Sequence, residues 1–373
     1  MPLYRLGVFH ELSKPKEQYE FVCFGDTKQE GGIEIIPWSM ANKVSDGGLN
    51  WIKTTNYFYL SERLLWQTGI IKRILFSKYE YFIFEGGVFH LPTWLFAILC
   101  RANGKKVLFW THGFKGLDKG LKKIIRIWYF KLAHGLLLYG NYSKRLMVKN
   151  GFDEDKLFVI YNSLYTEKKN NLLNNTDLKL ISEDKVKNFK NPDLPTIIFI
   201  GRLVISKNIP FLLNAVKDLS DEGNPINCII IGQGPEGENI KKFISTNHLE
   251  NNFHLTGSLY VEDQISKYFE MSDLMISPGN VGLNCIHSLA YGVPVITHDN
   301  LQFHGPEVEA IEPGKTGLLF EYNNYDDLLL KIKYWVNMKF TKVEVKKECH
   351  KVILNRYNPA DHAAGIINAI NLI

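Results

Sequence analysis

The sequence has few of the features that mark membrane-spanning, nucleic-acid-binding or secreted proteins. Its most apolar stretch, Leu91 to Cys100, covers about ten residues, whereas a helix that spans a bilayer needs about 20. The net charge of +5, from 44 basic and 39 acidic residues, is far from the charge density of a dedicated nucleic-acid-binding protein. No secretory signal is recognisable at the beginning of the sequence. We therefore expect a protein that neither crosses a membrane nor binds nucleic acid.

Cysteine is scarce and unpaired. The five cysteines are scattered and form no Cys-x-x-Cys motif, which argues against a disulfide framework and against a zinc site. Reduced thiols are typical of the cytoplasm, where we expect the protein, with the inner face of the membrane as a further location. His298 and His304 are close in sequence, but no carboxylate or cysteine at ligand spacing supports them, so we expect no metal.

The length of 373 residues suits two α/β domains of roughly 150 residues each. In the first half, six β-rich runs predict strands: Tyr19–Phe24, Glu34–Pro37, Tyr79–Phe84, Lys106–Trp110, Leu136–Tyr139 and Leu157–Ile160. Three helical patterns lie among them: Leu60–Phe76, Pro92–Arg101 and Gly120–Leu132. This alternation predicts a mainly parallel sheet with helices on both faces. The spacing of Tyr4, Leu6, Phe9 and Leu12 predicts a helix where a Rossmann-like domain normally opens with a strand.

The second half repeats the alternation more clearly. Its predicted strands are Thr196–Ile200, Asn227–Ile231, Phe253–Thr256, Leu274–Ser277 and Val293–Thr297. Its predicted helices are Ile209–Leu219, Gly237–Asn247 and Asn284–Tyr291, followed by a final amphipathic helix at Pro359–Ile373. Residues 166–194 are rich in Asn and Lys and predict a linker or surface excursion. We expect domains at 1–165, with the helix at about 357–373 added, and at 195–356.

The strongest chemical signal follows the strand Thr196–Ile200. Gly201 allows a tight turn at the strand end, and Arg202 and Lys207 extend from the same loop. Two cations beside the beginning of the next helix suit a pyrophosphate, because Arg binds two oxygens, Lys supplies a point charge and the helix end is positive. Two solvated surface cations are the alternative interpretation.

Two glycine-containing loops follow later strands. Gly232-Gln233-Gly234 is by itself more typical of a tight turn than of a ligand loop. Residues 279–283, Gly-Asn-Val-Gly-Leu, precede a predicted helix, where backbone N–H groups can approach an anion. A plain turn between strand and helix is the alternative for this segment too.

The order of these motifs resembles the group 1 (family 4) retaining glycosyltransferases of the GT-B fold, in which two Rossmann-like domains face each other across a cleft. The resemblance extends from about Val107 to Leu319. It rests on six segments in the family's order: WTHGF at Trp110–Phe114, VIYNSL at Val159–Leu164, FIGRLVISKN at Phe199–Asn208, IIGQGPE at Ile230–Glu236, SLAYGVPVI at Ser288–Ile296 and EPGKTGLLF at Glu312–Phe320.

The resemblance implies roles for the second-half residues. Arg202 and Lys207, with Gly201 at the turn, would hold the donor diphosphate. Backbone N–H groups of Gly279, Asn280, Val281, Gly282 and Leu283 would bind its sugar or phosphate. Such enzymes generally need no metal and no cofactor, because cations and helix ends stabilise the charge.

The sequence departs from the family at two glutamates spaced eight residues apart, one for the donor sugar and one for the ribose. Gly279 and His287 stand at those positions. His287 can still hydrogen-bond a ribose hydroxyl, and Glu307 or Glu309 is our candidate for the missing carboxylate. The departure leaves a non-catalytic nucleotide-binding homologue as one alternative, and a nucleotide-sugar epimerase is a second.

In the first half, two residues follow predicted strands at the edge where an acceptor would bind. The resemblance places His112 near the donor sugar, whereas a buried structural histidine is the alternative. Glu85 could bind or deprotonate the acceptor hydroxyl, or cap the next helix. The expected partners are a nucleotide-diphosphate sugar and a glycan or lipid-linked glycan in bacterial surface polysaccharide biosynthesis.

The helix predicted at Gly120–Leu132 interleaves basic and apolar residues. Such a helix can lie on an anionic membrane, which gives a peripheral membrane contact as a hypothesis. We favour the alternative, in which its apolar side chains pack on the sheet.

Overall fold

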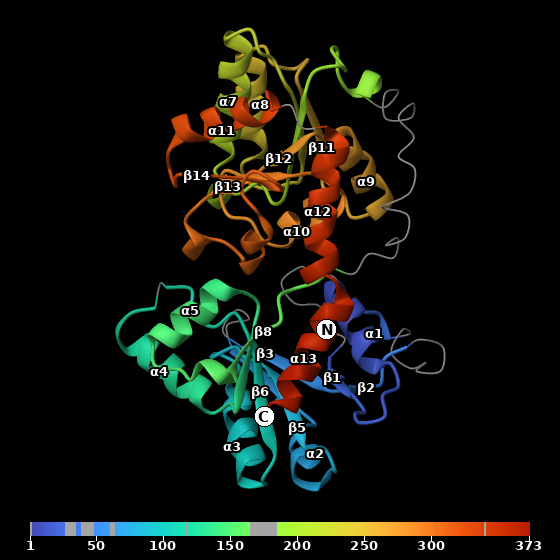
Figure 1. Ribbon diagram of the computed structural model, residues 1–373, viewed down its shortest axis with the longest axis vertical. Coiled ribbons are helices and arrows are strands. Elements are labelled where there is room, and N and C mark those ends of the chain that lie inside the picture. Colours follow the sequence, from blue (N-terminus) through green and yellow to red (C-terminus); the bar gives the residue numbers. More distant parts are fainter. Residues whose placement is uncertain are drawn as a thin grey trace. The chain divides into compact units, whose positions relative to one another are not determined.

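The computed structural model describes residues 2–26, 35–38, 48–59, 64–116, 118–164, 185–338 and 341–373. The chain forms two compact units, a first unit of Met1–Thr166 with Arg356–Ile373 and a second unit of Glu167–Asn355. Each unit is built on its own parallel sheet with helices packed on it (Figure 1). The predicted α/β class with two Rossmann-like sheets is confirmed.

The second unit contains a six-stranded sheet. Its strands are β9 (Thr196–Ile200), β10 (Asn227–Ile231), β11 (Phe253–Gly257), β12 (Leu274–Ile276), β13 (Val295–His298) and β14 (Gly317–Phe320). All neighbours are parallel, in the order β11-β10-β9-β12-β13-β14. Counted from β9, this is the 3-2-1-4-5-6 order of Rossmann folds, and the order reverses between β9 and β12. The carboxyl ends of these two strands are therefore the expected ligand position.

Among the described residues, the longer helices of this unit are α7 (Ile209–Asp221), α8 (Gly237–Thr246), α9 (Glu262–Met271), α10 (Leu283–Ala290), α11 (Tyr325–Val336) and α12 (Lys342–Arg356). The amphipathic α7 shows how they pack, because Leu212, Val216 and Leu219 recur on one face and are buried against the sheet. The part of the chain that the structure describes also contains the short 3-10 helices η1 (Leu3–Arg5), η4 (Glu154–Lys156), η5 (Ile205–Lys207), η6 (Leu301–Phe303) and η7 (Pro306–Ala310).

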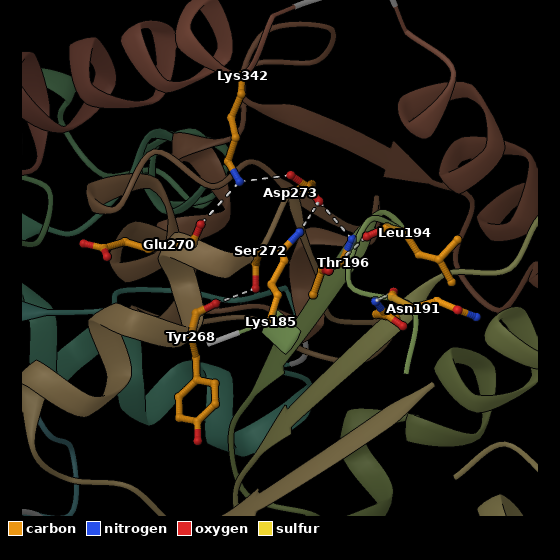
Figure 2. Close-up of polar contacts among 10 residues, drawn as sticks. Lys185, Asn191, Leu194, Thr196, Tyr268, Glu270, Ser272, Asp273 and Lys342 are labelled. Atoms are coloured by element: carbon orange, nitrogen blue, oxygen red, sulfur yellow. Dashed lines mark hydrogen bonds and ion pairs between the residues drawn. The ribbon is translucent and has the colours of Figure 1, made fainter. Parts of the chain in front are cut away.

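A polar cluster joins the amino ends of β9 and β12. The Asp273 carboxylate accepts a hydrogen bond of 2.9 Å from the Thr196 N–H, and the Asp273 N–H donates to the Thr196 carbonyl at 2.7 Å. Lys342 and Lys185 approach the same carboxylate at 3.0 and 3.9 Å (Figure 2). This cluster fixes the sheet at the edge opposite the expected ligand position.

The first unit contains a four-stranded parallel sheet of β5 (Tyr81–Glu85), β6 (Lys106–Thr111), β7 (Gly135–Leu138) and β8 (Leu157–Val159), in that order. Alternate residues point to opposite faces. Phe82 and Phe109 face the core shared with α2 (Ile71–Phe76), α3 (Leu91–Ala102), α4 (Gly120–Lys131) and α5 (Asn141–Lys149). Leu108 and Trp110 face the other way.

Helices from the two ends of the chain cover that second face. α1 (Leu6–Ser13) confirms the helix predicted near the start, and it lies beside α13 (Pro359–Asn371) (Figure 1). Val8 and Leu12 from α1 share a core cluster with Ile366 and Ile370 from α13. The last helix of the chain therefore completes the core of the first unit.

Three sequence predictions for the first half were wrong. Residues 64–76 are not one helix, because β4 (Leu64–Thr68) pairs antiparallel with β3 (Thr55–Tyr59) and Gly69, at φ +90°, separates it from α2. Cross-strand pairs such as Tyr57 with Trp66 and Phe58 with Leu65 outweigh the helical spacing. The strand predicted at Tyr19–Phe24 is limited to β1 (Cys23–Gly25), which pairs with β2 (Trp51–Lys53).

The strand predicted at Glu34–Pro37 is reduced to an isolated bridge between Ile35 and Pro2, and Glu34 itself lies outside the described residues. Most of the predicted linker, residues 166–184, also lies outside them.

Candidate functional site

The loop after β9 turns at Gly201, whose φ of +155° favours glycine. Arg202 then projects into solvent, and Lys207 lies half-buried in η5, just before α7. Gly232 and Gly234 pack directly under this loop, because a Cβ on Gly232 would lie 1.9 Å from the Gly201 carbonyl oxygen. The glycines after β10 therefore serve close packing, as the turn interpretation suggested.

The loop after β12 contacts the loop after β9 across the switch point. Lys207 Nζ donates a hydrogen bond of 2.6 Å to the Asn280 carbonyl, and the Gly279 N–H donates to the Lys207 carbonyl at 2.9 Å. Burial lowers the pKa of Lys207 to about 8, and no carboxylate contributes to that shift. A half-buried cation that has no ion pair among the described residues, at the expected ligand position, is suited to an anion.

Most backbone N–H groups of the loop after β12 are already engaged, which corrects the expectation that residues 279–283 all offer them to a ligand. The N–H groups of residues 279–282 donate, in that order, to the Lys207 carbonyl, the Ser206 carbonyl, His304 Nδ1 and Asn284 Oδ1. Leu283 opens α10, and the first N–H groups of a helix have no acceptor within that helix. The Leu283 end of the segment is therefore the part that suits an anion.

Gly279 cannot carry a side chain in this arrangement. A Cβ at this position would lie 2.1 Å from the Ser206 carbonyl oxygen and 2.5 Å from Lys207 Cα. The missing glutamate is therefore replaced by direct contact between the two loops. The side-chain oxygen of Asn280 is buried without a hydrogen-bond partner among the described residues.

Glu307 lies beside this loop, on η7. Its side chain is buried, and its carboxylate is close to Gly282 and Gly305, since a Cβ on either would come within 3.9 Å of Glu307 Oε2. This places a carboxylate at the positive amino end of α10. Glu309 is only half-buried on the same element.

His304 connects the loops after β12 and β13. Its Nδ1 accepts from the Val281 N–H at 3.0 Å, and its Nε2 lies 2.8 Å from the His298 carbonyl. Burial, and then His298, lower the pKa of His304 to about 3, so the ring is neutral when it holds the loop. Both histidines therefore have structural roles, and no group of three metal-ligating side chains occurs in the described part of the chain.

His287 is paired with a carboxylate that the sequence reasoning missed. His287 Nε2 lies 2.8 Å from Glu262 Oε1, and the same oxygen accepts a short hydrogen bond from the Tyr291 hydroxyl. Glu262 opens α9, whereas His287 lies on α10 and Tyr291 is the capping residue at the carboxyl end of α10. Glu262 is 25 positions from His287 on another helix, so no local pattern could reveal the pair.

In the first unit, Glu85 ends β5 and meets a buried arginine. Arg5 donates to Glu85 at 3.3 Å and to the Tyr139 hydroxyl at 2.8 Å, and it lies over the Trp110 ring. Partial desolvation opposes ionisation of Glu85, but Arg5, together with His90, outweighs it and keeps the pKa of the carboxyl below its usual value. The Glu85 side chain is 59% exposed, so an ionised carboxylate faces solvent at the carboxyl edge of this sheet.

His112 follows β6 at the same edge. His112 as a whole is exposed, but its ring packs against the Tyr139 ring, with the two centroids 4.7 Å apart. This desolvation, followed by Lys115 and Arg5, lowers the pKa of His112 to about 4. Its carbonyl accepts from the Ser143 hydroxyl at 2.8 Å. His112 and Glu85 therefore belong to one cluster around Arg5 and Tyr139, which contains a neutral imidazole and a carboxylate.

The apolar residues of α4 do not all pack on the sheet, which corrects the interpretation that we favoured. Tyr129 and Phe130 are buried, whereas Leu121 and Trp128 are 70% and 67% exposed. Ile124 and Ile125 are exposed beside them. Among the helices that the structure describes, none is long and apolar enough to cross a bilayer.

These features define a protein of the GT-B class, with two Rossmann-like units and a candidate anion site at the switch point of the second. Solved structures share the fold along the whole chain. The apo lipopolysaccharide outer core galactosyltransferase WaaB matches with a TM-score of 0.68 and 14% identity, covering 99% of this chain and 94% of its own. Anabaena Alr3699/HepE, solved with UDP, matches with a TM-score of 0.71 and 14% identity, covering 100% and 97%. At this identity the likeness shows the fold alone.

Residues 181–358 match the family model of glycosyl transferases group 1, so this part of the chain is similar to that family. A curated relative, the poly(ribitol-phosphate) alpha-N-acetylglucosaminyltransferase of Staphylococcus aureus (strain COL), is 24% identical over 61% of this chain and 42% of its own length. The 2-deoxystreptamine N-acetyl-D-glucosaminyltransferase of Niallia circulans is 27% identical over 33% of this chain and 31% of its own length. The chain thus aligns with less than half the length of these relatives.

Proposed function

We propose that the protein transfers a sugar from a nucleotide-diphosphate sugar to a hydroxyl of a glycan or lipid-linked glycan, in bacterial surface polysaccharide synthesis. The observation that carries this proposal is the contact between Lys207 and the loop before α10, at the switch point of the second sheet. The names of WaaB and of the staphylococcal relative support the acceptor class. UDP in the HepE structure supports the donor class.

In this proposal the second unit stabilises the leaving nucleotide. Arg202 and Lys207 neutralise the diphosphate charge that grows as the sugar leaves, and the amino end of α10 adds its positive field. Glu307 takes the part of the missing donor-sugar carboxylate, because it is the buried carboxylate beside Gly282. Retention at the anomeric carbon is part of the proposal through the family resemblance.

The first unit presents the acceptor. Glu85 accepts a hydrogen bond, and finally a proton, from the attacking hydroxyl, because Arg5 keeps it ionised. His112 stays neutral and hydrogen-bonds the sugar. We propose these two roles as a pair, since the same cluster positions both side chains.

A thermal-shift screen with UDP, GDP, ADP, dTDP and CMP, repeated on Arg202→Ala, tests the donor site. A ligand of the folded state raises the melting temperature by mass action. We expect one nucleoside diphosphate to stabilise the wild type and to lose most of its effect on the variant. No stabilisation by any of them would leave the donor site without support.

Product analysis then separates transfer from the two alternatives. A transferase releases nucleoside diphosphate in proportion to glycosylated acceptor. An epimerase would convert the donor sugar in the absence of any acceptor. A non-catalytic homologue would bind the nucleotide without turnover in either assay.

We also propose that α4 contacts an anionic membrane. Its exposed stripe of Leu121, Ile124 and Trp128 is interleaved with basic residues, and the helix contains no acidic residue. The neighbouring α3 adds the exposed Leu95 and Ile98, and it adjoins α4 through rings of Trp94 and Tyr129 4.9 Å apart. Apolar side chains flanked by cations suit an anionic lipid surface.

Co-sedimentation with vesicles tests this contact at low salt. We expect binding to phosphatidylcholine vesicles that contain phosphatidylglycerol, weak binding without it, and loss of binding in Leu121→Ala/Trp128→Ala. Tyr334→Ala/Val343→Ala is the control, because these residues are also exposed but lie on α11 and α12. Equal binding by the two double variants would refute the surface. A concentration-dependent dimer lost in Leu121→Ala/Trp128→Ala would assign it to a second copy instead.

A further inference from the structure

Glu262 and His287 form a pair next to the anion site. α10 begins at Leu283, and His287 follows it by four residues, so the two lie on the same face of the helix. One turn of helix separates them, about 6 Å at 1.5 Å per residue. In a nucleoside diphosphate, the pentose is the group attached to the phosphates. A diphosphate at Lys207 and Leu283 therefore brings the pentose within reach of His287.

The hydrogen bonds around Glu262 fix which nitrogen of His287 carries a proton. A carboxylate only accepts hydrogen bonds, and Glu262 Oε1 accepts from both the Tyr291 hydroxyl and His287 Nε2. In the neutral imidazole, Nδ1 then carries a lone pair. Within the described residues, no hydrogen bond to His287 Nδ1 occurs. The ring offers an acceptor to a hydroxyl, as a carboxylate at this position would.

The surroundings hold this ring in one orientation. The His287 side chain is 17% exposed, and its ring lies 5.3 Å from Phe269 and 5.4 Å from Tyr291. Phe269 and Tyr291 are themselves stacked, with centroids 5.1 Å apart. The imidazole is thus confined on two sides by rings and on a third by Glu262.

We propose that Glu262 is a positioning residue that sets the His287 tautomer, so that His287 Nδ1 accepts a hydrogen bond from a ribose hydroxyl and selects ribonucleotides over deoxyribonucleotides. This inference rests on the proposed donor site. An isosteric amide at position 262 can donate to Nε2 instead, which moves the ring proton to Nδ1 and removes the acceptor.

Calorimetric titration of the full chain with UDP, 2′-deoxy-UDP and 3′-deoxy-UDP tests the proposal. We expect the wild type to bind at least one deoxy analogue about tenfold more weakly than UDP, the usual effect of one lost hydrogen bond in a formed site. In Glu262→Gln, the affinity for UDP should fall to that for the deoxy analogue. The ratio of the two affinities should therefore be about one. Tyr291→Phe should retain discrimination, because Glu262 still orients His287.

Glu238→Gln is the matched control, since Glu238 also lies in the first turn of a helix but pairs with the exposed Lys241. Its ratio should equal that of the wild type. Equal affinity of the wild type for UDP and both analogues would overturn the inference while leaving the donor site intact. Retained discrimination in Glu262→Gln would also overturn it. A wild type that binds UDP not at all would overturn the UDP site itself and this inference with it.

Discussion

Lys207 and Asn280 are 73 positions apart, yet the Lys207 ammonium donates a 2.6 Å hydrogen bond to the Asn280 carbonyl. The contact joins the loops after β9 and β12, which flank the reversal in strand order. A backbone carbonyl carries only a partial charge, so the ammonium remains available to an anion.

Lys207→Met should weaken UDP binding by about ten- to a hundredfold, because charged hydrogen bonds contribute about 1.5–3 kcal/mol. The methionine fills most of the same space, so the melting temperature without ligand should change little. Lys241→Met is the control, since Lys241 is an exposed cation on α8. Calorimetry measures both affinities, and equal values in the two variants would remove Lys207 from the site.

UDP affinity should fall as the pH rises through about 8. Burial lowers the pKa of Lys207 to about 8, so the free protein carries the cation below this pH and loses it above. The terminal phosphate of UDP, with a second pKa of about 6, stays fully ionised over this range. The decline should approach tenfold per pH unit. Lys207→Arg should flatten the profile, because arginine stays charged, and a sloping profile in that variant would point to another group.

Glu307→Gln should lower kcat by about a hundredfold, the scale found when one electrostatic partner of a transition state is removed. Its effect on the dissociation constant of UDP should be small, because the carboxylate is assigned to the sugar and not to the nucleotide. Glu309→Gln is the comparison, as Glu309 is half-buried on the same short helix. Steady-state kinetics with melting curves as a folding control measure both. Wild-type turnover in Glu307→Gln would exclude it from the reaction.

Asp273→Ala should lower the free energy of unfolding by about 1–3 kcal/mol, because it removes an acceptor of the Thr196 N–H and the carboxylate that Lys342 and Lys185 approach. Asp221→Ala breaks an exposed pair with Lys217 on α7 and should lower the free energy of unfolding much less, because exposed ion pairs contribute little. Urea unfolding compares the two variants. A loss in Asp273→Ala no greater than in Asp221→Ala would show that the cluster in Figure 2 contributes nothing specific.

Much of the second unit could be predicted from its sequence, because buried parallel strands are continuous runs of Ile, Val and Leu between glycine turns. Ile197–Ile200 and Cys228–Ile231 are such runs, and both form strands as expected. The fold of the first unit was harder to predict from the sequence. Leu64–Thr68 has apolar residues at a spacing that a helix also allows, and only its pairing with Thr55–Tyr59 makes it a strand.

The candidate site shows the same division. Arg202 and Lys207 could be found because they follow a strand and a glycine in one local pattern. The sequence could not show which N–H groups remain for a ligand, because the acceptors of residues 279–282 come partly from η5 and from His304. The partners of Glu85 and His287 were also hidden, because Arg5 and Glu262 are 80 and 25 positions away from them.

The placement of α13 has a consequence for the order in which the chain acquires its structure during synthesis. The second unit is one continuous segment, Glu167–Asn355, whereas the first also needs Arg356–Ile373. Ile366, Ile370 and Ile373 are synthesised after the whole second unit, and they share a core cluster with Val8, Leu108 and Leu137. We therefore expect the first unit to finish folding only after the second unit has been synthesised, with an apolar sheet face in need of a chaperone until α13 is available.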